Sequence, residues 1–304
     1  MSAELASPAP RLSVIVPVYR DWPLLERCLA ALRVQDWPAA DFEILVVSND
    51  SHPPPTHLAT PGSLPAVHLL HEPAGHSYAA RNAGLLVARG TVLAFTDADC
   101  TPAPGWLAAG WAALETDTDA ALAGGRVRTV APHRNLATDY DLVFAFHQDE
   151  NVRKGHAVTA NLFVRRTVFE AIGPFNGALQ SSGDFEFCRR AVQAGWRLVY
   201  APEAMVDHPA RDSVAALLRK NRRIGSGYRR REFELKGLGL EARLRWAAGM
   251  LKPRLRYWWL LFKGTEHTRQ LPPLRRARVV LLQALLHYHF AVSVLRPPPS
   301  KDRH

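Results

Sequence analysis

The chain has 304 residues, of which 47% are apolar and 22% charged, so it can bury a full core and is not disordered as a whole. Its net charge is +10, but Arg211–His304 holds 22 of the 38 Lys and Arg residues and only 6 of the 28 Asp and Glu residues. An acidic front joined to a basic end is typical of a catalytic or binding body with a part that meets a polyanion, either nucleic acid or an anionic lipid surface.

Short apolar runs alternate with helical patterns along the first hundred residues. Leu12–Tyr19 is a β-branched run that predicts a strand, and Trp22–Leu32 carries apolar residues at helical spacing. Further strands are predicted at Phe42–Val47, Val67–Leu70 and Thr91–Thr96, with a helix over Ser77–Ala88. This alternation predicts an α/β domain with a mostly parallel central sheet.

The second half continues the same domain. Thr159–Val164 is strand-like, and a helix is predicted from Asp184 to Ala194, ending at Gly195. In a parallel sheet, ligands bind beyond the carboxyl ends of the strands. The segments at these ends are Pro17–Tyr19, Ser48–Ser51 and Asp97–Asp99.

Two carboxylates emerge directly after the strand that finishes at Thr96. Asp97 and Asp99 are two residues apart, and like charges so close repel each other unless a cation lies between them. A hard divalent ion, Mg²⁺ or Mn²⁺, meets that need and keeps positions open for diphosphate oxygens. The pattern indicates a reaction in which a nucleotide diphosphate is the leaving group. Taken alone, it also fits aspartates that cap the turn at Thr101 and Pro102.

Several segments, in one order, resemble a known family. Ala74–Pro102, with the sequence AGHSYAARNAGLLVARGTVLAFTDADCTP, resembles the donor-site region of the family 2 inverting glycosyltransferases with the GT-A fold. Val14–Tyr19 resembles the family's first strand and base-binding turn. Three later segments resemble the acceptor half of this family, namely Thr159–Asn161, Ser182–Arg190 and Tyr200–Pro202. The resemblance covers roughly residues 11 to 230, and the shared order of several weak motifs favours a metal site over turn capping.

The resemblance implies a nucleoside site at the first two strands. Pro17, Val18 and Tyr19 would line the base, and Asn49 and Asp50 would lie near base and ribose. Many relatives carry an aspartate one or two places earlier. Which residue among positions 48 to 50 contacts the nucleoside therefore stays open.

The resemblance also implies a metal and diphosphate site. Arg81 matches the donor-site arginine, whose guanidinium suits either the diphosphate or the aspartates that hold the metal; the alternative is a surface helix arginine. The implied metal ligands are Asp97 and Asp99, and the implied cofactor is Mn²⁺ or Mg²⁺. His208 matches a position that completes the metal shell or contacts phosphate, and a structural histidine is the alternative.

Asp184 matches the family's catalytic base, which takes the proton from the acceptor hydroxyl during an inverting displacement. Many relatives have Glu-Asp at this point, whereas this chain has Gly183 before Asp184. Glu186 is the reserve candidate, and helix N-capping by Asp184 is the alternative role.

The basic C-terminal part points to a membrane surface. Between Arg211 and Glu232 there are eight basic residues against two acidic ones. Two apolar runs follow, Tyr257–Phe262 and Val279–Leu295, the second bracketed by arginines. We expect a basic helical extension over residues 231–304 that lies in the membrane without crossing it; the alternative is helices that pack on the catalytic domain, residues 11–230.

These observations predict a glycosyltransferase that moves a sugar from a nucleotide diphosphate, with UDP favoured, to a glycan or lipid-linked acceptor in cell-envelope synthesis. The three cysteines lie far apart without a CxxC pair, and no secretory leader pattern opens the chain, so a cytoplasmic position at the inner face of the cell membrane is expected. No nucleic-acid-binding module accompanies the basic charge. The alternatives are a nucleotidyltransferase, which lacks its Gly-rich loop here, and a catalytically silent nucleotide-sugar-binding scaffold at the membrane.

Overall fold

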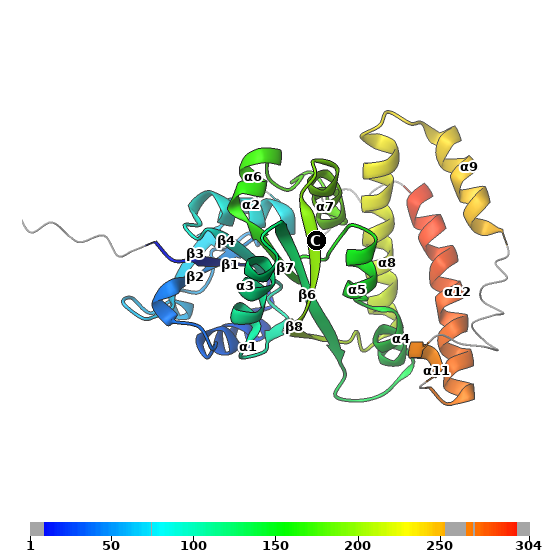
Figure 1. Cartoon of the computed structure of the whole chain (residues 1–304). Coiled ribbons are helices and arrows are strands. Elements are labelled where there is room, and N and C mark those ends of the chain that lie inside the picture. The colour runs from blue at the N-terminus through cyan, green and yellow to red at the C-terminus, as the bar shows by residue number, and fades with distance from the viewer. Residues whose placement is uncertain (1–8, 74, 253–265, 270, 297–304) are drawn as a thin grey trace, which may run out of the picture. The chain divides into compact units, whose positions relative to one another are not determined.

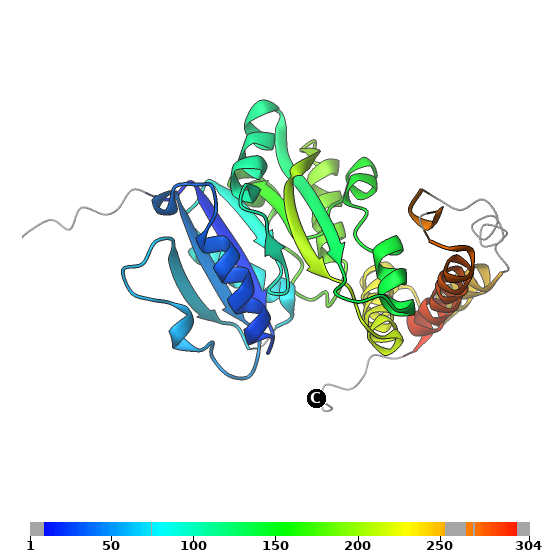
Figure 2. The same cartoon turned by 90° about the horizontal axis from the view of Figure 1, so that it is seen from below.

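The computed structural model describes residues 9–73, 75–252, 266–269 and 271–296 (Figures 1 and 2). The chain divides into two compact units. The first comprises the residues up to 128 together with 146–178 and 183–208, and the second comprises 129–145, 179–182 and the residues from 209 on. Each unit buries apolar clusters of its own.

An eight-stranded sheet forms the centre of the first unit. Its strands, in spatial order, are β3 (Ala66–His71), β2 (Phe42–Ser48), β1 (Leu12–Val18), β4 (Val92–Thr96), β7 (Asn161–Arg165), β6 (Ala120–Val130), β8 (Arg197–Pro209) and β5 (Thr101–Pro102). β1 runs parallel to β2 and β4, and β2 runs parallel to β3. β7 runs antiparallel to both β4 and β6, and β5 runs antiparallel to β8.

The mixed α/β fold is confirmed, and the parallel part of the sheet is the half that contains β1 to β4. The strands added by the second half of the sequence include antiparallel pairs. Apolar runs do not reveal strand direction, because a strand buried on both faces has the same composition in either orientation. The predicted strand at residues 159–164 begins two residues later, at Asn161.

Helices cover both faces of this sheet (Figure 1). They are α1 (Trp22–Arg33), α2 (Ser77–Val87), α3 (Trp106–Thr116), α5 (Gln148–Arg153), α6 (Arg166–Ile172) and α7 (Gly183–Gln193), with short 3₁₀ turns at Ala39–Asp41 and Thr56–Leu58. On one face, Leu29 of α1 and Trp106 of α3 share a buried cluster with Val14 of β1. On the other, a Cβ added to Gly84 of α2 would lie 2.8 Å from Ile15, so α2 approaches β1 closely. Burial on both faces explains why these strands are continuous apolar runs.

The second unit is helical. Its elements are α4 (Leu136–Phe144), α8 (Val214–Arg229), a π-helical turn (Arg230–Glu234), α9 (Leu240–Leu251), α11 (Glu266–Arg269) and α12 (Pro273–Leu295). α12 packs on α4 and α8 through Ala137, Leu217 and Leu286. The rings of Tyr228 and Phe290 lie 5.6 Å apart and belong to an aromatic cluster that also contains Phe233 and Trp246. These helices therefore form a core among themselves.

α12 contains the apolar run that the sequence indicated at Val279–Leu295. With 23 residues it is long and apolar enough to cross a membrane, and 44% of its apolar window is buried inside the protein. One polar side chain of the run, Gln283, accepts a hydrogen bond of 2.7 Å from the Tyr140 hydroxyl of α4. α12 is thus compatible with membrane association and also packs within its unit. The other apolar run, Tyr257–Phe262, lies outside the described residues.

Candidate active site

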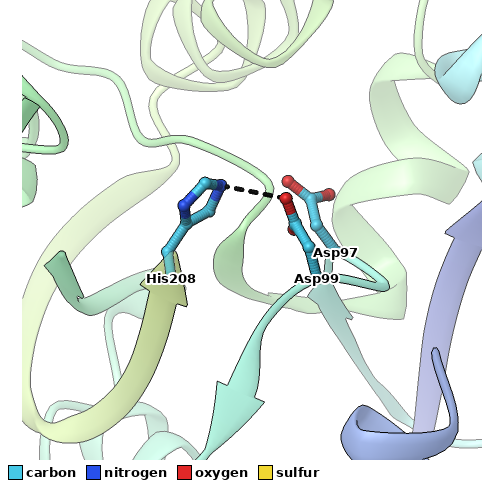
Figure 3. A group of neighbouring side chains, drawn as sticks. All are labelled: Asp97, Asp99 and His208. Carbon is cyan, nitrogen blue, oxygen red and sulfur yellow. Dashed lines mark ion pairs between the residues drawn. The ribbon is translucent and has the colours of Figure 1, made fainter. Parts of the chain in front are cut away.

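An acidic turn and a histidine meet at the end of β4 (Figure 3). Asp97 and Asp99 follow β4, and β5 comes directly after them and pairs with β8, with Thr101 opposite Asp207. This pairing places His208 beside the turn, with its Nε2 3.5 Å from Oδ2 of Asp99. Each of the three side chains offers one ligand atom, and these atoms all lie within 4.8 Å of one another.

The chemistry of this cluster suits a divalent cation. The Asp97 and Asp99 side chains are 34% and 32% exposed, whereas the His208 side chain is 5% exposed. Two carboxylate oxygens and an imidazole nitrogen around one point form a partial ligand set, and the exposed side of the carboxylates leaves room for further oxygen ligands. The cluster can therefore hold Mn²⁺ or Mg²⁺ together with an oxygen-rich group from solvent.

The cysteine of the same turn does not belong to the ligand set. Cys100 is buried, and its burial, together with the charges of Asp97 and Asp99, raises the pKa of the thiol well above its usual value. A neutral thiol is a poor metal ligand, because the thiolate is the binding form. The donor atoms of this cluster are therefore oxygen and nitrogen.

Arg81 of α2 is buried against the acidic turn. Its Nη2 donates a short hydrogen bond to Oδ1 of Asp97, and its Nη1 donates to the Ser77 carbonyl at 3.3 Å. The residue is only 3% exposed, so it is not a surface helix arginine. Of the two partners considered for it, the aspartates and a diphosphate, the structure shows the contact with Asp97. A fixed guanidinium here orients that carboxylate and offsets part of its charge.

The proposed nucleoside segments lie at the carboxyl ends of the adjacent strands β1 and β2. The Asn49 N–H donates to the Val18 carbonyl at 3.0 Å, which ties the two strand ends together. Tyr19 is 47% exposed, whereas Asp50 is buried. The N–H of Ser51 donates to Oδ1 of Asp50 at 2.7 Å and lowers the pKa of that carboxyl.

Arg20 also lowers the pKa of Asp50, since its Nε donates to the same Oδ1 at 3.1 Å. Arg20 was not among the residues expected from the sequence. Its φ of 62° lies in the left-handed region, which few side chains adopt. Strained backbone at the end of β1 is a feature that only the structure reveals.

Asp184 lies in the first turn of α7 and is 8% exposed. The Tyr78 hydroxyl and the Phe185 N–H each donate to Oδ1 at 2.9 Å, and the Thr159 N–H donates to Oδ2 at 3.3 Å. Burial raises the pKa of Asp184, and these hydrogen bonds and the charge of Arg81 offset part of that increase. The helix begins at Gly183, so Asp184 lies inside the first turn and not at the N-cap position.

The reserve candidate Glu186 is engaged elsewhere. Its Oε1 accepts a hydrogen bond of 2.7 Å from Nε of Arg190, one turn further along α7. That ion pair holds one oxygen of the carboxylate on its own helix, and the other, Oε2, is buried without a hydrogen-bond partner among the described residues.

The glycine before Asp184 has a steric explanation. A Cβ at position 183 would lie 2.7 Å from two ring carbons of Tyr78, which is closer than real Cβ contacts allow. The tyrosine ring therefore occupies the space that a larger residue would need. Gly183 and Tyr78 are a matched pair, and the pair brings the tyrosine hydroxyl to Asp184.

Tyr78 was missed as a site residue, although a signal was present. It lies three residues before Arg81 in the helix predicted at 77–88, so both side chains share one face of α2.

Asn161 is the opposite case, because the sequence indicated it but its side chain has a structural role. It belongs to a motif that resembles the family's acceptor half, yet its side chain donates to the carbonyls of Arg126 and Ala204 and accepts from Trp106, each at 2.8 Å. Its hydrogen bonds hold neighbouring strands and α3 together.

Comparison with known proteins gives a consistent family. The model of "Glycosyl transferase family 2" matches residues 13–173, and that of "Glycosyl transferase family group 2" matches residues 95–298. Glycosyltransferase AglE of Haloferax volcanii is 36% identical over 228 residues, which cover 73% of this chain and 74% of that protein.

Solved structures share the fold at lower identity. The mannosyltransferase PcManGT from Pyrobaculum calidifontis, in complex with GDP-Man and Mn²⁺, aligns with a TM-score of 0.51 and 18% identity over 94% of this chain and 74% of its own. S. aureus TarS residues 1–349, in complex with UDP-GlcNAc, aligns with a TM-score of 0.53 and 15% identity over 93% of this chain and 90% of its own. These likenesses support the GT-A fold.

Proposed function

The chain belongs to glycosyl transferase family 2 and is a glycosyltransferase, and from this premise we propose that it moves a sugar from a nucleoside diphosphate to an acceptor hydroxyl with inversion at the anomeric carbon. The observation that carries the proposal is the cluster of Asp97, Asp99 and His208, with Arg81 fixed on Asp97. A cluster of this kind at the carboxyl end of β4 is placed where α/β sheets bind nucleotides. Family membership favours this activity over a nucleotidyltransferase or a silent scaffold.

Asp97, Asp99 and His208 would hold the metal. A bound Mn²⁺ or Mg²⁺ neutralises diphosphate oxygens and so makes the nucleoside diphosphate a better leaving group. Mg²⁺ strongly prefers an all-oxygen shell, whereas the imidazole of His208 suits a softer ion. We therefore favour Mn²⁺, the ion that is present with GDP-Man in the mannosyltransferase of similar fold.

The ends of β1 and β2 would bind the nucleoside. The Ser51 N–H and Arg20 lower the pKa of Asp50, which favours its ionised form, and a carboxylate can accept hydrogen bonds from ribose hydroxyls. The ring of Tyr19, a residue that is 47% exposed, would contact the base, and Pro17, Val18 and Asn49 would complete this part of the site. UDP is the favoured nucleotide through the family resemblance, and UDP-GlcNAc is the ligand in the similar structure of TarS.

Asp184 would act as the base. Its carboxylate takes the proton of the acceptor hydroxyl, the acceptor oxygen bonds to the anomeric carbon, and the bond from that carbon to the diphosphate oxygen breaks. Burial raises the pKa of Asp184, which makes the carboxylate a stronger proton acceptor than an exposed aspartate. Tyr78 and the Thr159 N–H hold the carboxylate in one orientation.

The basic C-terminal part, residues 231–304, would bring the enzyme to the cytoplasmic face of an anionic membrane. Support comes from its excess of Lys and Arg and from α12, which has the length and composition of a membrane helix. An enzyme held there would reach a lipid-linked or cell-envelope glycan. Residues 11–230 would form the catalytic domain.

A nucleotide titration tests the donor site. The purified protein is titrated with UDP, GDP and their sugar conjugates, with and without Mn²⁺ or Mg²⁺, by calorimetry. We expect one nucleotide to bind with metal dependence and Asp99→Ala to weaken that binding about 100-fold or more. Asp119→Ala, an exposed aspartate in the same unit, is the control and should bind as the unchanged protein does. Binding that is equal in Asp99→Ala and the control would overturn the metal site.

A further inference from the structure

The outward face of α12 is apolar. Leu274, Leu281, Leu285 and Val292 are 64%, 60%, 66% and 38% exposed. They follow one another at intervals of seven, four and seven residues, so they lie along one straight stripe of the helix. The opposite face already packs in the core of the second unit, through residues such as Leu286. α12 therefore has apolar surface on both sides, and among the residues that the structure describes the outward stripe is exposed.

A pocket rich in arginine lies at the N-terminal end of this stripe. It has a volume of about 210 Å³ and is lined by Arg134, Asn135, Leu136, Asp139, Arg275 and Arg278. Water occupies about 30 Å³ per molecule in the liquid, so the pocket has room for a phosphate group. The lining includes three arginines and one aspartate, which gives the pocket a net positive charge.

The buried carboxylate of the pocket positions two of these arginines. Asp139 is 2% exposed; its Oδ1 accepts a hydrogen bond of 2.6 Å from Nε of Arg134, and its Oδ2 lies 3.6 Å from Nη1 of Arg275. Arg278 is exposed on α12. It lies four residues after Leu274 and three before Leu281, so the third guanidinium stands beside the apolar stripe.

The start of α12 adds to the attraction for an anion. The helix begins at Pro273, has no side-chain hydrogen bond to its N-cap and has no acidic residue in its first turn. No acidic side chain of the helix's own first turn therefore offsets the partial positive charge of its N-terminus. In α4, by contrast, Asn135 and Thr138 form a capping box that uses the first amides internally. The side chains of the pocket that can bind an anion are therefore Arg275 and Arg278 of α12 and Arg134.

We propose that this arginine pocket binds the phosphate of an anionic phospholipid while the stripe of Leu274, Leu281, Leu285 and Val292 enters the apolar edge of the bilayer. The proposal deepens the proposed membrane association and names its contacts. Guanidinium groups bind phosphate oxygens in pairs of hydrogen bonds. Nucleic acid satisfies the arginines but leaves the leucines in water, whereas a lipid satisfies both.

Vesicle binding tests the proposal. Partition of the full chain is measured by sedimentation with vesicles of phosphatidylcholine alone and of phosphatidylcholine mixed equally with phosphatidylglycerol. Arg275→Gln combined with Arg278→Gln should lower the partition on the anionic vesicles roughly 30-fold, about fivefold for each arginine. The matched control removes two charges in the first unit, with Arg153→Gln and Lys154→Gln, whose side chains are 71% and 62% exposed, and should lower it much less.

A second variant tests the stripe without touching the charge. Leu281→Ser combined with Leu285→Ser replaces exposed side chains, so the fold should persist, as circular dichroism can check. We expect partition on both kinds of vesicle to fall roughly tenfold or more. The single variant Arg278→Gln, at an exposed position, keeps Arg275 and its contact with Asp139. It therefore separates loss of lipid binding from any effect of Arg275→Gln on folding.

Three outcomes would overturn the proposal. One is equal partition of the arginine variant and its charge control. Another is arginine-dependent binding of inorganic phosphate, measured by calorimetry, with no binding to vesicles. The third is a dimer, detected by light scattering, that the serine variant dissolves, which would assign the stripe to a second copy of the chain. Partition is measured without nucleotide or metal, so a failure here is separate from a failure of the donor site.

Discussion

The two aspartates of the metal cluster and the proposed base Asp184 lie in opposite environments. Asp97 and Asp99 are about one third exposed and meet a histidine and a buried arginine, whereas Asp184 is 8% exposed among hydrogen-bond donors. The first pair can share a cation, whereas burial raises the pKa of the third. In the proposed mechanism, one residue type would thus serve both metal binding and base catalysis, because burial and neighbours differ.

Removing the charge of Asp184 should give the largest effect. Asp184→Asn keeps the shape but cannot accept the acceptor's proton, so we expect turnover to fall about 10²- to 10⁴-fold. Nucleotide binding, which we propose depends on Asp97 and Asp99, should stay within about twofold in a calorimetric titration. Glu186→Gln is the matched control; a larger loss of turnover in that variant would transfer the base role to Glu186.

The steric match of Gly183 and Tyr78 should show in stability. Gly183→Ala places a Cβ 2.7 Å from the tyrosine ring, and such overpacking costs about 1–3 kcal/mol of the free energy of unfolding. Combining it with Tyr78→Leu should recover part of the loss, since the ring is gone. Gly105→Ala, where a Cβ meets nothing within 4 Å, is the control in the same thermal-unfolding measurement. Equal destabilisation of both alanine variants would show that the tyrosine is not the cause.

The smallest expected effect is on the pH dependence of turnover. Asp184 acts as a carboxylate, so turnover should rise as the pH rises through its pKa. The Tyr78 hydrogen bond stabilises the carboxylate and lowers that pKa, and Tyr78→Phe should therefore move the acidic limb of the pH–rate profile to higher pH. The pKa of Tyr78 itself is raised, so the hydroxyl stays a donor throughout the range. An unmoved limb in Tyr78→Phe would count against this role of the hydroxyl.

Local sequence patterns predict most of the helices and strands and many of the candidate site residues. Apolar runs rich in β-branched residues predict the buried strands β1, β2 and β4. The spacing of Asp97 and Asp99 after the last of these runs already indicates a cation site. Residue spacing along the chain is enough to predict these strands and the aspartates that follow one of them. The carboxyl ends of neighbouring parallel strands lie at the same edge of the sheet, so residues at these ends are expected near one another.

Tertiary structure alone decided which distant residues complete the site. His208 reaches Asp99 through the pairing of β5 with β8, and Tyr78 reaches Asp184 from 106 residues away in the sequence. The antiparallel strands and the arginine pocket between α4 and α12 arise in the same way. The periodicity of apolar residues in the sequence does not reveal such contacts, because they depend on how separate elements pack. The burial that raises the pKa of Asp184 has the same origin, since desolvation is a property of the packed core and not of the residue.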